Sequence, residues 1–452
     1  MNTTMASLRW LAHATPAASP RIGPSLRRLA FGLACLALPA LAMAAPLLDG
    51  GSRGSWTEQK VSADVPGPDN SFGYAVAVEG DVAVVGEPYG AVDGNPEQGL
   101  AHVYVREGGT WTQSQVLVAD DGAAGDGFGF SVSISGGTIL VGAPYATVGA
   151  NGGQGAAYVF RQSGGSWSQE QKLVTAAGGA SNNFGWSVAV SGATAIVSAP
   201  VAPVGENALQ GNATVFTEDA GSWTEGPTLV AADGTGFATF GSAVAIDGDT
   251  IVIGANGVNS YFGAAYVFER SGTDWIQVAR LAPDDGTTLE FFGISVAVSG
   301  ENAIVGAYNQ RVGDNNGQGS AYVFTASAGT WTQAQKLVAS DGAASARFGL
   351  AVDIDGATAL VGSYFADVDA NVNQGAAYVF RLEGGTWNET DKLVASDGAA
   401  DENLGNAVAL SGDTALVGVL NAEIDGNAGA GAAVFFTAPA DDTIFADGFE
   451  LP

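Results

Sequence analysis

The sequence repeats one seven-residue pattern seven times at an almost constant interval. The copies begin at residues 72, 128, 184, 240, 292, 348 and 404, and they read FGYAVAV, FGFSVSI, FGWSVAV, FGSAVAI, FGISVAV, FGLAVDI and LGNAVAL. Successive copies lie 56 residues apart, except for an interval of 52 between the fourth and the fifth. Self-similarity at a fixed period of this size marks a repeat architecture, in which each unit is one small supersecondary structure.

Each unit contains four short segments rich in Val, Ala, Tyr and Phe, separated by Gly, Asp, Asn and Ser. Examples are FGFSVSI (128–134), ILVGAP (139–144), QGAAYVF (154–160) and WTQAQKLVAS (331–340). Partly alternating segments between turn-forming residues are typical of β-strands. Seven units of four strands predict an all-β fold, a seven-bladed β-propeller of four-stranded blades. The main alternative, a β-solenoid, would show a much shorter repeat and capping ends.

A Trp opens the fourth segment of each of the first six units, 17 residues before the next copy of the pattern. These residues are Trp111, Trp167, Trp223, Trp275, Trp331 and Trp387. The seventh unit ends after AGAAVFF (430–436) without such a segment, whereas Trp56 opens SWTEQKVSADV (55–65), 16 residues before Phe72. We therefore expect the N-terminal strand to complete the last blade and close the ring, which removes exposed sheet edges.

The pairing of Phe128-Gly129 with Gly142-Ala143-Pro144 resembles the FG-GAP repeat of the integrin alpha-chain propeller. The chain is more similar still to bacterial secreted FG-GAP repeat proteins, over about residues 55–437. In integrin-like propellers, calcium binds a D-x-D-x-D-G loop in the first-to-second turn. Here those turns have only two or three residues, as in EGD (79–81), so that site is not carried over.

Residues 1–44 have the features of a secretory signal peptide. Three basic residues, Arg21, Arg27 and Arg28, precede an apolar run (29–42), and the small residues of Ala42-Met43-Ala44 suit cleavage. The run is shorter than the roughly 20 residues that span a membrane. We predict an exported protein, extracellular, on the cell surface or periplasmic, with no membrane span. Behind the signal we place a linker (45–54), the propeller (55–437) and a C-terminal tail (438–452), either a sorting signal or a frayed end.

The charge of the exported part limits its partners. Cleavage removes four Arg and no acidic residue, so the net charge falls from −30 to −34, and no cysteine remains. Such acidity argues against a nucleic-acid or anionic-lipid partner, because phosphate binding needs clustered Lys and Arg. It is compatible with solubility outside the cell and with cation binding.

The strand order predicts where a ligand would bind. In a four-stranded blade, the second-to-third and fourth-to-first connections lie on one face, and here they are the long ones, as in YGAVDGNPEQG (89–99) and ASDGAASAR (339–347). Long loops on a rigid scaffold are the usual binding surfaces. In the sixth unit, Asp367, Asp369, Asn371 and Asn373 alternate as oxygen ligands of Ca²⁺ would. Val372 stands where a sharp turn needs Gly, however, and a solvated Asp/Asn turn is the alternative.

Signals for catalysis are sparse in the exported part. Its one histidine, His102, occupies a strand position that is Tyr in other units, so we interpret it as structural. Cysteine nucleophiles and His clusters for zinc are missing from the sequence after residue 44. The repeated Trp, Tyr and Phe are expected in the core because they recur at fixed strand positions. We therefore expect a monomeric binding or adhesion module, not an enzyme, with an extracellular protein or glycan as ligand. A secreted hydrolase or lyase using face carboxylates and a structural envelope or matrix component are the alternatives.

Overall fold

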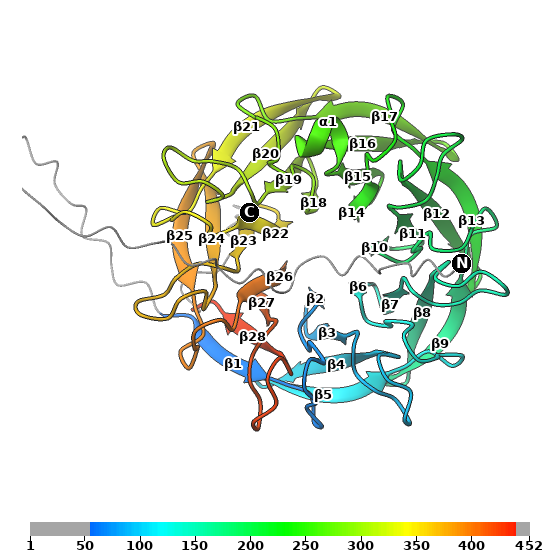
Figure 1. Ribbon diagram of the computed structural model, residues 1–452, viewed down its shortest axis with the longest axis horizontal. Coiled ribbons are helices and arrows are strands. Elements are labelled where there is room, and N and C mark those ends of the chain that lie inside the picture. Colours follow the sequence, from blue (N-terminus) through cyan, green and yellow to red (C-terminus); the bar gives the residue numbers. More distant parts are fainter. Residues whose placement is uncertain (1–54, 440–452) are drawn as a thin grey trace, which may run out of the picture. The chain divides into compact units, whose positions relative to one another are not determined.

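The computed structural model describes residues 55–439, which form a ring of seven four-stranded antiparallel blades (Figure 1). The predicted all-β fold, a seven-bladed β-propeller, is therefore confirmed. The predicted signal peptide, the predicted linker and all but the first two residues of the predicted tail lie outside the described residues. In every blade the first strand lines the centre of the ring and the fourth lies at its circumference (Figure 1).

The strands follow one another blade by blade. Blade 1 contains β2 (Val76–Glu79), β3 (Val82–Glu87), β4 (Leu100–Glu107) and β5 (Thr110–Leu117). Blade 2 contains β6 (Ser131–Ser135), β7 (Thr138–Ala143), β8 (Ala156–Ser163) and β9 (Ser166–Leu173). Blade 3 contains β10 (Val188–Ser191), β11 (Thr194–Ala199), β12 (Asn212–Asp219) and β13 (Ser222–Leu229). Blade 4 contains β14 (Phe240–Asp247), β15 (Thr250–Ala255), α1 (Val258–Tyr261), β16 (Ala264–Ser271) and β17 (Asp274–Leu281).

The remaining blades continue this order. Blade 5 contains β18 (Val296–Ser299), β19 (Asn302–Ala307), β20 (Ser320–Ser327) and β21 (Thr330–Leu337). Blade 6 contains β22 (Phe348–Asp355), β23 (Thr358–Ser363), β24 (Ala376–Glu383) and β25 (Thr386–Leu393). Blade 7 contains β26 (Leu404–Ser411), β27 (Thr414–Val419), β28 (Ala432–Thr437) and β1 (Thr57–Val61).

Burial within a blade explains the sequence pattern of its strands. β7 is buried along its whole length, because neighbouring blades cover both faces of the sheet, and it reads as a continuous apolar run. The outer strand β5 instead alternates, burying Trp111 and Leu117 and exposing Thr112 between them. Trp111 is 2% exposed, and Phe128, at the start of the repeated pattern, is fully buried. The predicted core role of the repeated aromatic residues is confirmed.

Two glycines of the FG and GAP motifs meet at six of the seven contacts between neighbouring blades, and at the contact of blades 3 and 4 Ser198 faces Gly241 instead. A Cβ atom on Gly86 of blade 1 would lie 2.0 Å from the carbonyl oxygen of Gly129 in blade 2. Gly129 itself has a φ of +90°, which residues with a side chain rarely adopt, and a Cβ there would lie 2.1 Å from the Leu100 oxygen. The motif is therefore a packing requirement: backbone touches backbone where the inner strands of two blades converge.

A second set of contacts joins the blades at the opposite end of the inner strands. The N–H of Gly136, in the first-to-second turn of blade 2, donates to Glu79 Oε2 of blade 1 at 2.8 Å. The same bond recurs at the other six seams, from the amides of Gly192, Gly248, Gly300, Gly356, Gly412 and Gly80 to Ser135, Ser191, Asp247, Ser299, Asp355 and Ser411, respectively. We call this set the glycine girdle. Because the Gly80–Ser411 bond joins blade 7 to blade 1, the girdle is a closed circle.

The N-terminal strand completes blade 7 as predicted. β1 pairs antiparallel with β28, with Thr57 opposite Thr437 and Val61 opposite Ala433. Gln59 of β1 also bridges to blade 1, where its side chain accepts from the Trp111 N–H at 2.9 Å and donates to the Trp111 carbonyl at 2.6 Å. The same glutamine bridge occurs between Gln115 and Trp167. The closing seam therefore uses contacts found elsewhere in the ring.

The shorter spacing between Trp56 and Phe72 has a structural cause. Each of the other six outer strands contains a β-bulge. In β5, Gln113 and Gln115 pair with adjacent residues of β4, so that Ser114 is the extra residue. β1 pairs with β28 residue by residue and has no bulge. It consequently needs one residue fewer to reach the next blade.

Deletion of residues 55–65 should destabilise the ring. The variant loses the pairing of β1, part of the core around Trp56 and the Gln59 bridge, and it exposes the edge of β28. We expect a loss of at least about 3 kcal/mol in the free energy of unfolding, measured by urea denaturation, together with self-association on gel filtration. Gln59→Ala, which removes only the bridge, should cost about 1–2 kcal/mol. An unchanged unfolding midpoint for the deletion would show that β1 does not close the ring.

Candidate binding face

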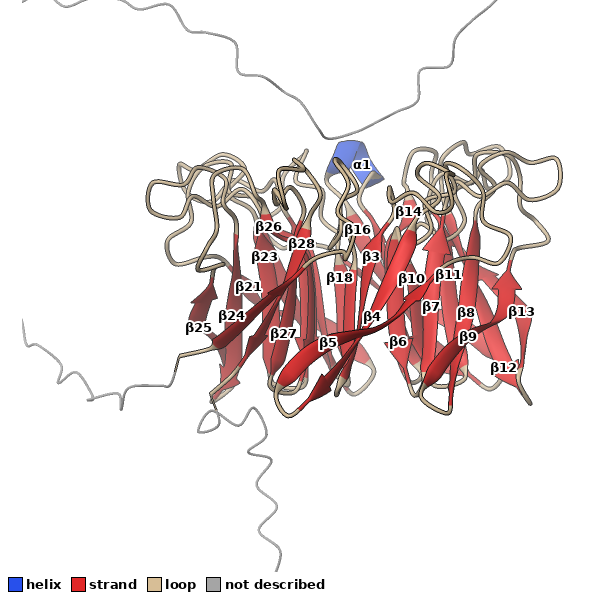
Figure 2. Cartoon of the chain, turned by 90° about the horizontal axis from the view of Figure 1, so that it is seen from below, coloured by secondary structure: helices blue, strands red, loops and turns tan. Residues whose placement is uncertain are grey.

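The connections of every blade divide between the two ends of the ring. The first-to-second and third-to-fourth turns are tight, whereas the second-to-third and fourth-to-first connections are long and gather at the opposite end (Figure 2). We call this end the long-loop face. The structure places the long connections there as the strand order predicted.

Six of the seven second-to-third connections contain the same small hairpin. In blade 1, the backbones of Val92 and Asn95 exchange hydrogen bonds of 3.1 and 2.8 Å, and Asn95 Nδ2 donates to Gln98 Oε1 at 2.9 Å. Equivalent backbone bridges form at Val148–Asn151, Val204–Asn207, Val312–Asn315, Val368–Asn371 and Ile424–Asn427. The Asn and Gln of these loops therefore shape the loops themselves.

The four candidate calcium ligands lie in such a loop of blade 6. Asn371 is its hairpin residue, and its Nδ2 donates to Gln374 Oε1 at 2.9 Å and to the Gly398 carbonyl at 3.0 Å. Asp367 Oδ1 accepts from the Asn373 backbone N–H at 2.9 Å, and Asn373 Nδ2 donates to Asp401 Oδ1 at 2.8 Å. Asp367 and Asp369 are exposed. Within residues 55–439, no three His, Cys, Asp or Glu side chains are placed to hold a metal ion. Calcium binding at these two carboxylates and two amides stays a prediction.

The Asp-Gly turns of the fourth-to-first connections hold neighbouring blades together. Asp285, between blades 4 and 5, accepts from the Tyr322 hydroxyl at 2.7 Å and from Lys336 Nζ at 2.6 Å. Asp121 and Asp341 bind a Tyr and a Lys of the following blade in the same way. Each of these three turns therefore carries an ion pair to the following blade, which the spacing of the residues in the sequence did not reveal.

His102 takes part in a buried network at the seam between blades 7 and 1. Its Nε2 lies 2.7 Å from Glu87 Oε2, and its Nδ1 lies 2.9 Å from Gln113 Oε1. The imidazole and the Glu87 carboxyl are each about 5% exposed or less. Asn70, in the loop that follows β1, donates to Glu87 Oε1 at 2.6 Å. His102 thus lies in the strand position predicted for it, and Glu87 and His102 together replace the Ala and Tyr that blades 2, 4 and 5 have at these positions.

The aromatic residues outside the repeated strand positions form a different group. Apart from Phe435, which is buried in β28 where other units have Val, residues 55–439 contain twelve, all at the long-loop end of the blades: Tyr74, Tyr89, Phe130, Tyr145, Trp186, Phe237, Tyr261, Phe262, Phe291, Tyr308, Tyr364 and Phe365. On blades 1 to 3, the Phe130 ring lies 4.8 Å from Tyr74 and 4.7 Å from Trp186 between ring centres. On blades 4 and 5, Phe291 lies 4.9 Å from Tyr261 and 5.1 Å from Tyr308. One face of the ring therefore carries all the aromatic surface that the repeat does not require.

Blade 4 interrupts this face with a shortened loop. Its second-to-third connection (256–263) has four residues fewer than the corresponding loop of blade 2 (144–155), which accounts for the 52-residue interval. The loop contains α1, in which Asn259, Ser260 and Tyr261 have φ values of 50°, 61° and 65°. Left-handed backbone costs about 1–2 kcal/mol per residue for residues with a side chain. The chain keeps a strained turn at this site.

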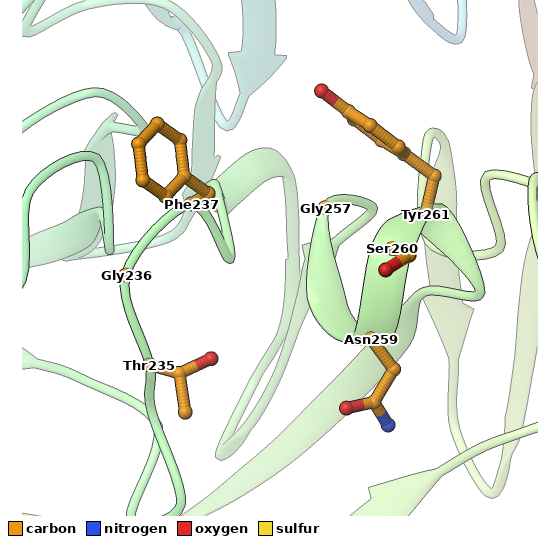
Figure 3. A pocket seen from close by; sticks show the side chains of 7 residues that line it. All are labelled: Thr235, Gly236, Phe237, Gly257, Asn259, Ser260 and Tyr261. Carbon is orange, nitrogen blue, oxygen red and sulfur yellow. The ribbon is translucent and has the colours of Figure 1, made fainter.

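A hollow of about 420 Å³ lies beside this turn, lined by Thr235, Gly236, Phe237, Gly257, Asn259, Ser260 and Tyr261 (Figure 3). The rings of Phe237 and Tyr261 stand on opposite sides of it, with Thr235 on the side of Phe237 and Ser260 and Asn259 on the side of Tyr261 (Figure 3). Phe237 is 64% exposed and Tyr261 is 45% exposed. The hollow thus combines apolar walls with hydroxyl and amide groups, as small-molecule sites commonly do.

Phe237 and Leu289 occupy equivalent positions in consecutive blades, three residues before the repeated pattern. All seven residues at this position have positive φ, and in the other blades they are Asp69, Gly125, Ser181, Ser345 and Asp401. Asp, Gly and Ser suit a solvated left-handed turn, whereas Phe and Leu suit it poorly. Leu289 is 53% exposed, so burial does not compensate. We call Phe237, Tyr261 and Leu289 the apolar rim.

A second hollow, of about 360 Å³, is lined by Leu289 and by residues of the long connections before and after blade 5 and within it. Its lining includes Glu290, Asn309, Arg311 and Arg347. Glu290 is 3% exposed, and its Oε1 accepts from the Thr287 hydroxyl at 2.7 Å. The long-loop face of blades 3 to 6 therefore carries two hollows, the first lined by Phe237 and Tyr261 and the second by Leu289.

The architecture and the glycine contacts define a class of protein, the β-propeller built from sequence repeats. The FG-GAP repeat family matches the chain seven times, at residues 56–104, 111–160, 167–216, 223–268, 275–324, 331–380 and 387–436. The chain belongs to the FG-GAP repeat family. A search of curated proteins found no match to it. No helix of residues 55–439 is long and apolar enough to cross a membrane.

The sequence reasoning missed the apolar rim and both hollows. Two signals could have found them. The 52-residue interval already located the shortened loop of blade 4, and a comparison of the repeats would have shown Phe237 and Leu289 where other units have Asp, Gly or Ser. The search for alternating oxygen ligands instead directed attention to blade 6.

The ion pairs and hydrogen bonds of Asp121, Asp285 and Asp341 should make the stability of the ring sensitive to acid. Burial alone would raise the pKa values of Asp121, Asp285 and Asp341, but hydrogen bonds from the paired Lys and Tyr and the Lys charge bring them below the ordinary value. A lowered pKa in the folded state stabilises the protein above the unfolded pKa of about 3.9, and this contribution is lost as the pH falls through the folded pKa. The triple Asp→Asn variant should be less stable than the parent at pH 7, and the difference between the urea midpoints should shrink as the pH falls below the ordinary pKa of Asp.

Asp353 also makes stability depend on pH, and its contribution has to be separated from that of the three Asp-Gly residues. Burial raises its pKa to about 7, so ionisation of this group opposes folding as the pH rises. Parent and variant share this contribution, and it cancels in their difference. A difference in midpoint that stays constant from pH 7 to pH 3 would show that these three carboxylates do not stabilise the ring through their charge.

The calcium prediction has a separate test. If Asp367 and Asp369 bind Ca²⁺, calorimetric titration of the parent should show heat of binding that Asp367→Ala and Asp369→Ala each abolish. Asp425→Ala, at the loop position of blade 7 equivalent to Asp369, is the matched control and should leave the heat unchanged. If titration of the parent with Ca²⁺ shows no heat of binding, this loop does not bind calcium.

Proposed function

We propose that this FG-GAP propeller is an exported binding module whose long-loop face recognises an extracellular protein or glycan through the apolar rim. One observation carries the proposal: Phe237 and Leu289 are large, exposed and apolar at left-handed positions that other blades give to Asp, Gly or Ser. Neither burial nor backbone preference accounts for them. Strained residues that folding does not require tend to cluster at ligand-binding sites.

The surroundings of the rim support recognition. Tyr261 belongs to the same surface and is held by the strained turn of α1. The two hollows that the rim residues line are large enough for groups of a ligand, at the lower end of the roughly 300–1,000 Å³ typical of small-molecule sites. Exposed apolar patches of this kind mark interaction sites on soluble proteins. In this proposal the propeller acts as a monomer by binding or adhesion, without catalysis.

Replacement of the rim should remove binding and spare the fold. We expect the mature protein to capture ligands on glycan and extracellular-protein arrays, and the double variant Phe237→Ser, Leu289→Gly to lose at least about 90% of that signal, since central apolar contacts dominate interfaces. Because both substitutions suit a left-handed turn, the free energy of unfolding should stay within about 1 kcal/mol of the parent or rise. Urea denaturation measures that second quantity.

The matched control removes an exposed apolar residue elsewhere. Ile276, on the outer strand β17, is 52% exposed, and Thr occupies its position in several other blades. Ile276→Thr should leave capture unchanged. Equal capture by the rim variant and the parent would show that the ligand binds another part of the molecule.

A further inference from the structure

Arg347 differs from most other cationic side chains of this acidic protein. Within residues 55–439, nine of them form ion pairs with carboxylates: Lys60, Arg106, Arg161, Lys172, Arg270, Arg280, Arg311, Lys336 and Lys392. The Arg347 guanidinium instead donates to the amide oxygen of Asn309 and lies 5.4 Å from the centre of the Tyr308 ring. No described carboxylate is within ion-pair distance of it. Its charge is available to a ligand.

The position of Arg347 is costly for the fold. It immediately precedes the repeated pattern, where all seven residues have positive φ, and blades 1, 2, 3 and 7 place Ser71, Gly127, Asn183 and Asn403 there. Arg347 has a φ of 62° and is half-buried. A long cationic side chain is disfavoured in this left-handed backbone conformation, and here it forms no ion pair with a described carboxylate. The same reasoning that singled out the apolar rim therefore singles out Arg347.

The hollow that Arg347 lines has the hydrogen-bonding character of a sugar site. Hydroxyl and amide groups surround it, from Thr287, Thr288, Asn309, Asn316 and Ser345. Arg311, whose side chain is 61% exposed, supplies a second cation at its edge. The ring of Tyr308 stacks on Phe291, which leads to Tyr261 and the first hollow. Aromatic faces pack against the C–H face of a sugar ring, while hydroxyl and amide groups bind its hydroxyls.

Glu290 limits the anion that the hollow can accept. It lines the hollow, and its Oε2 is buried without a hydrogen-bond partner. Burial raises the pKa of Glu290 above its ordinary value. The Glu290 carboxylate disfavours a doubly charged phosphate more than a singly charged group. The strongly negative protein also repels an acidic peptide, which carries several carboxylates, more than it repels a ligand with a single carboxylate.

We propose that the hollow bounded by Arg347, Arg311 and Glu290 binds the carboxylate-bearing residue of an acidic saccharide, a hexuronate. The Arg347 fork pairs with the carboxylate, and the surrounding hydroxyl and amide groups bind the ring hydroxyls. The remaining sugar residues extend over Tyr308 and Phe291 towards the apolar rim. This inference rests on the proposed function, because it assigns a ligand class to the same surface.

The test compares uronates with their neutral parents. Saturation-transfer NMR and titration of the mature protein with glucuronate and galacturonate should show binding at least about tenfold tighter than with glucose and galactose, since charge-assisted hydrogen bonds carry the difference. Arg347→Asn, which suits the left-handed position, should remove that preference and leave the weak binding of the neutral sugars. Arg347→Lys should keep part of it. Arg161→Gln removes one charge near the end of β8 that lies away from the long-loop face, and it should leave the uronate preference unchanged.

Three results would overturn the inference. They are equal binding of uronates and neutral sugars by the parent, a preference for acetate or for an Asp/Glu hexapeptide over the uronates, and a uronate preference that persists in Arg347→Asn. If uronates fail while the rim variant still loses array binding, the proposed function stands and only the ligand class is wrong. If the rim variant binds array ligands normally while uronates bind through Arg347, the uronate site stands and recognition through the apolar rim is wrong.

Discussion

The close contact between glycine backbones, at six of the seven seams, governs the rest of this structure. Where Gly86 meets Gly129, no space remains for a Cβ atom on either residue, so the inner strands of neighbouring blades converge to backbone contact. This convergence tilts the blades into a ring, buries both faces of each middle strand, and leaves only the ends of the blades for variation. The glycine girdle then fixes the opposite end of the inner strands, with one hydrogen bond at each seam. One end of the ring is thus uniform, and the other carries the differences between blades.

The family repeat and the blade are offset by one strand, and closure follows from that offset. Each FG-GAP match begins at a Trp of an outer strand and ends in the third strand of the next blade, as in 56–104. Seven whole repeats therefore leave an unpaired outer strand at the start and a three-stranded blade at the end. The two halves complete each other through β1 and β28. No special closing segment is needed.

The fold could be predicted from the sequence because every part of it is repeated. Blade number, strand order, the core role of Trp111 and its equivalents, and the closing role of Trp56 all followed from spacing. The ion pair of Asp285 with Lys336 could not be predicted, since its partners lie 51 residues apart in different blades. Nor could the bulge of β5 be predicted, although its absence from β1 explains a one-residue difference in spacing. The candidate site escaped prediction for the opposite reason: it consists of departures from the repeat, whose meaning depends on backbone conformation at Phe237, Leu289 and Arg347.

The pairing of the two terminal strands also determines how the ring would respond to force. Thr57, where β1 begins, lies opposite Thr437, where β28 ends, so both chain ends leave blade 7 at the same corner of the sheet. A pull that separates these two points loads the β1–β28 hydrogen bonds one at a time, as in opening a zipper. A pull between either point and a ligand on the long-loop face is instead distributed over several seams. Attachment of the protein through one terminus would therefore preserve the ring under load, whereas attachment through both would make blade 7 the first to open.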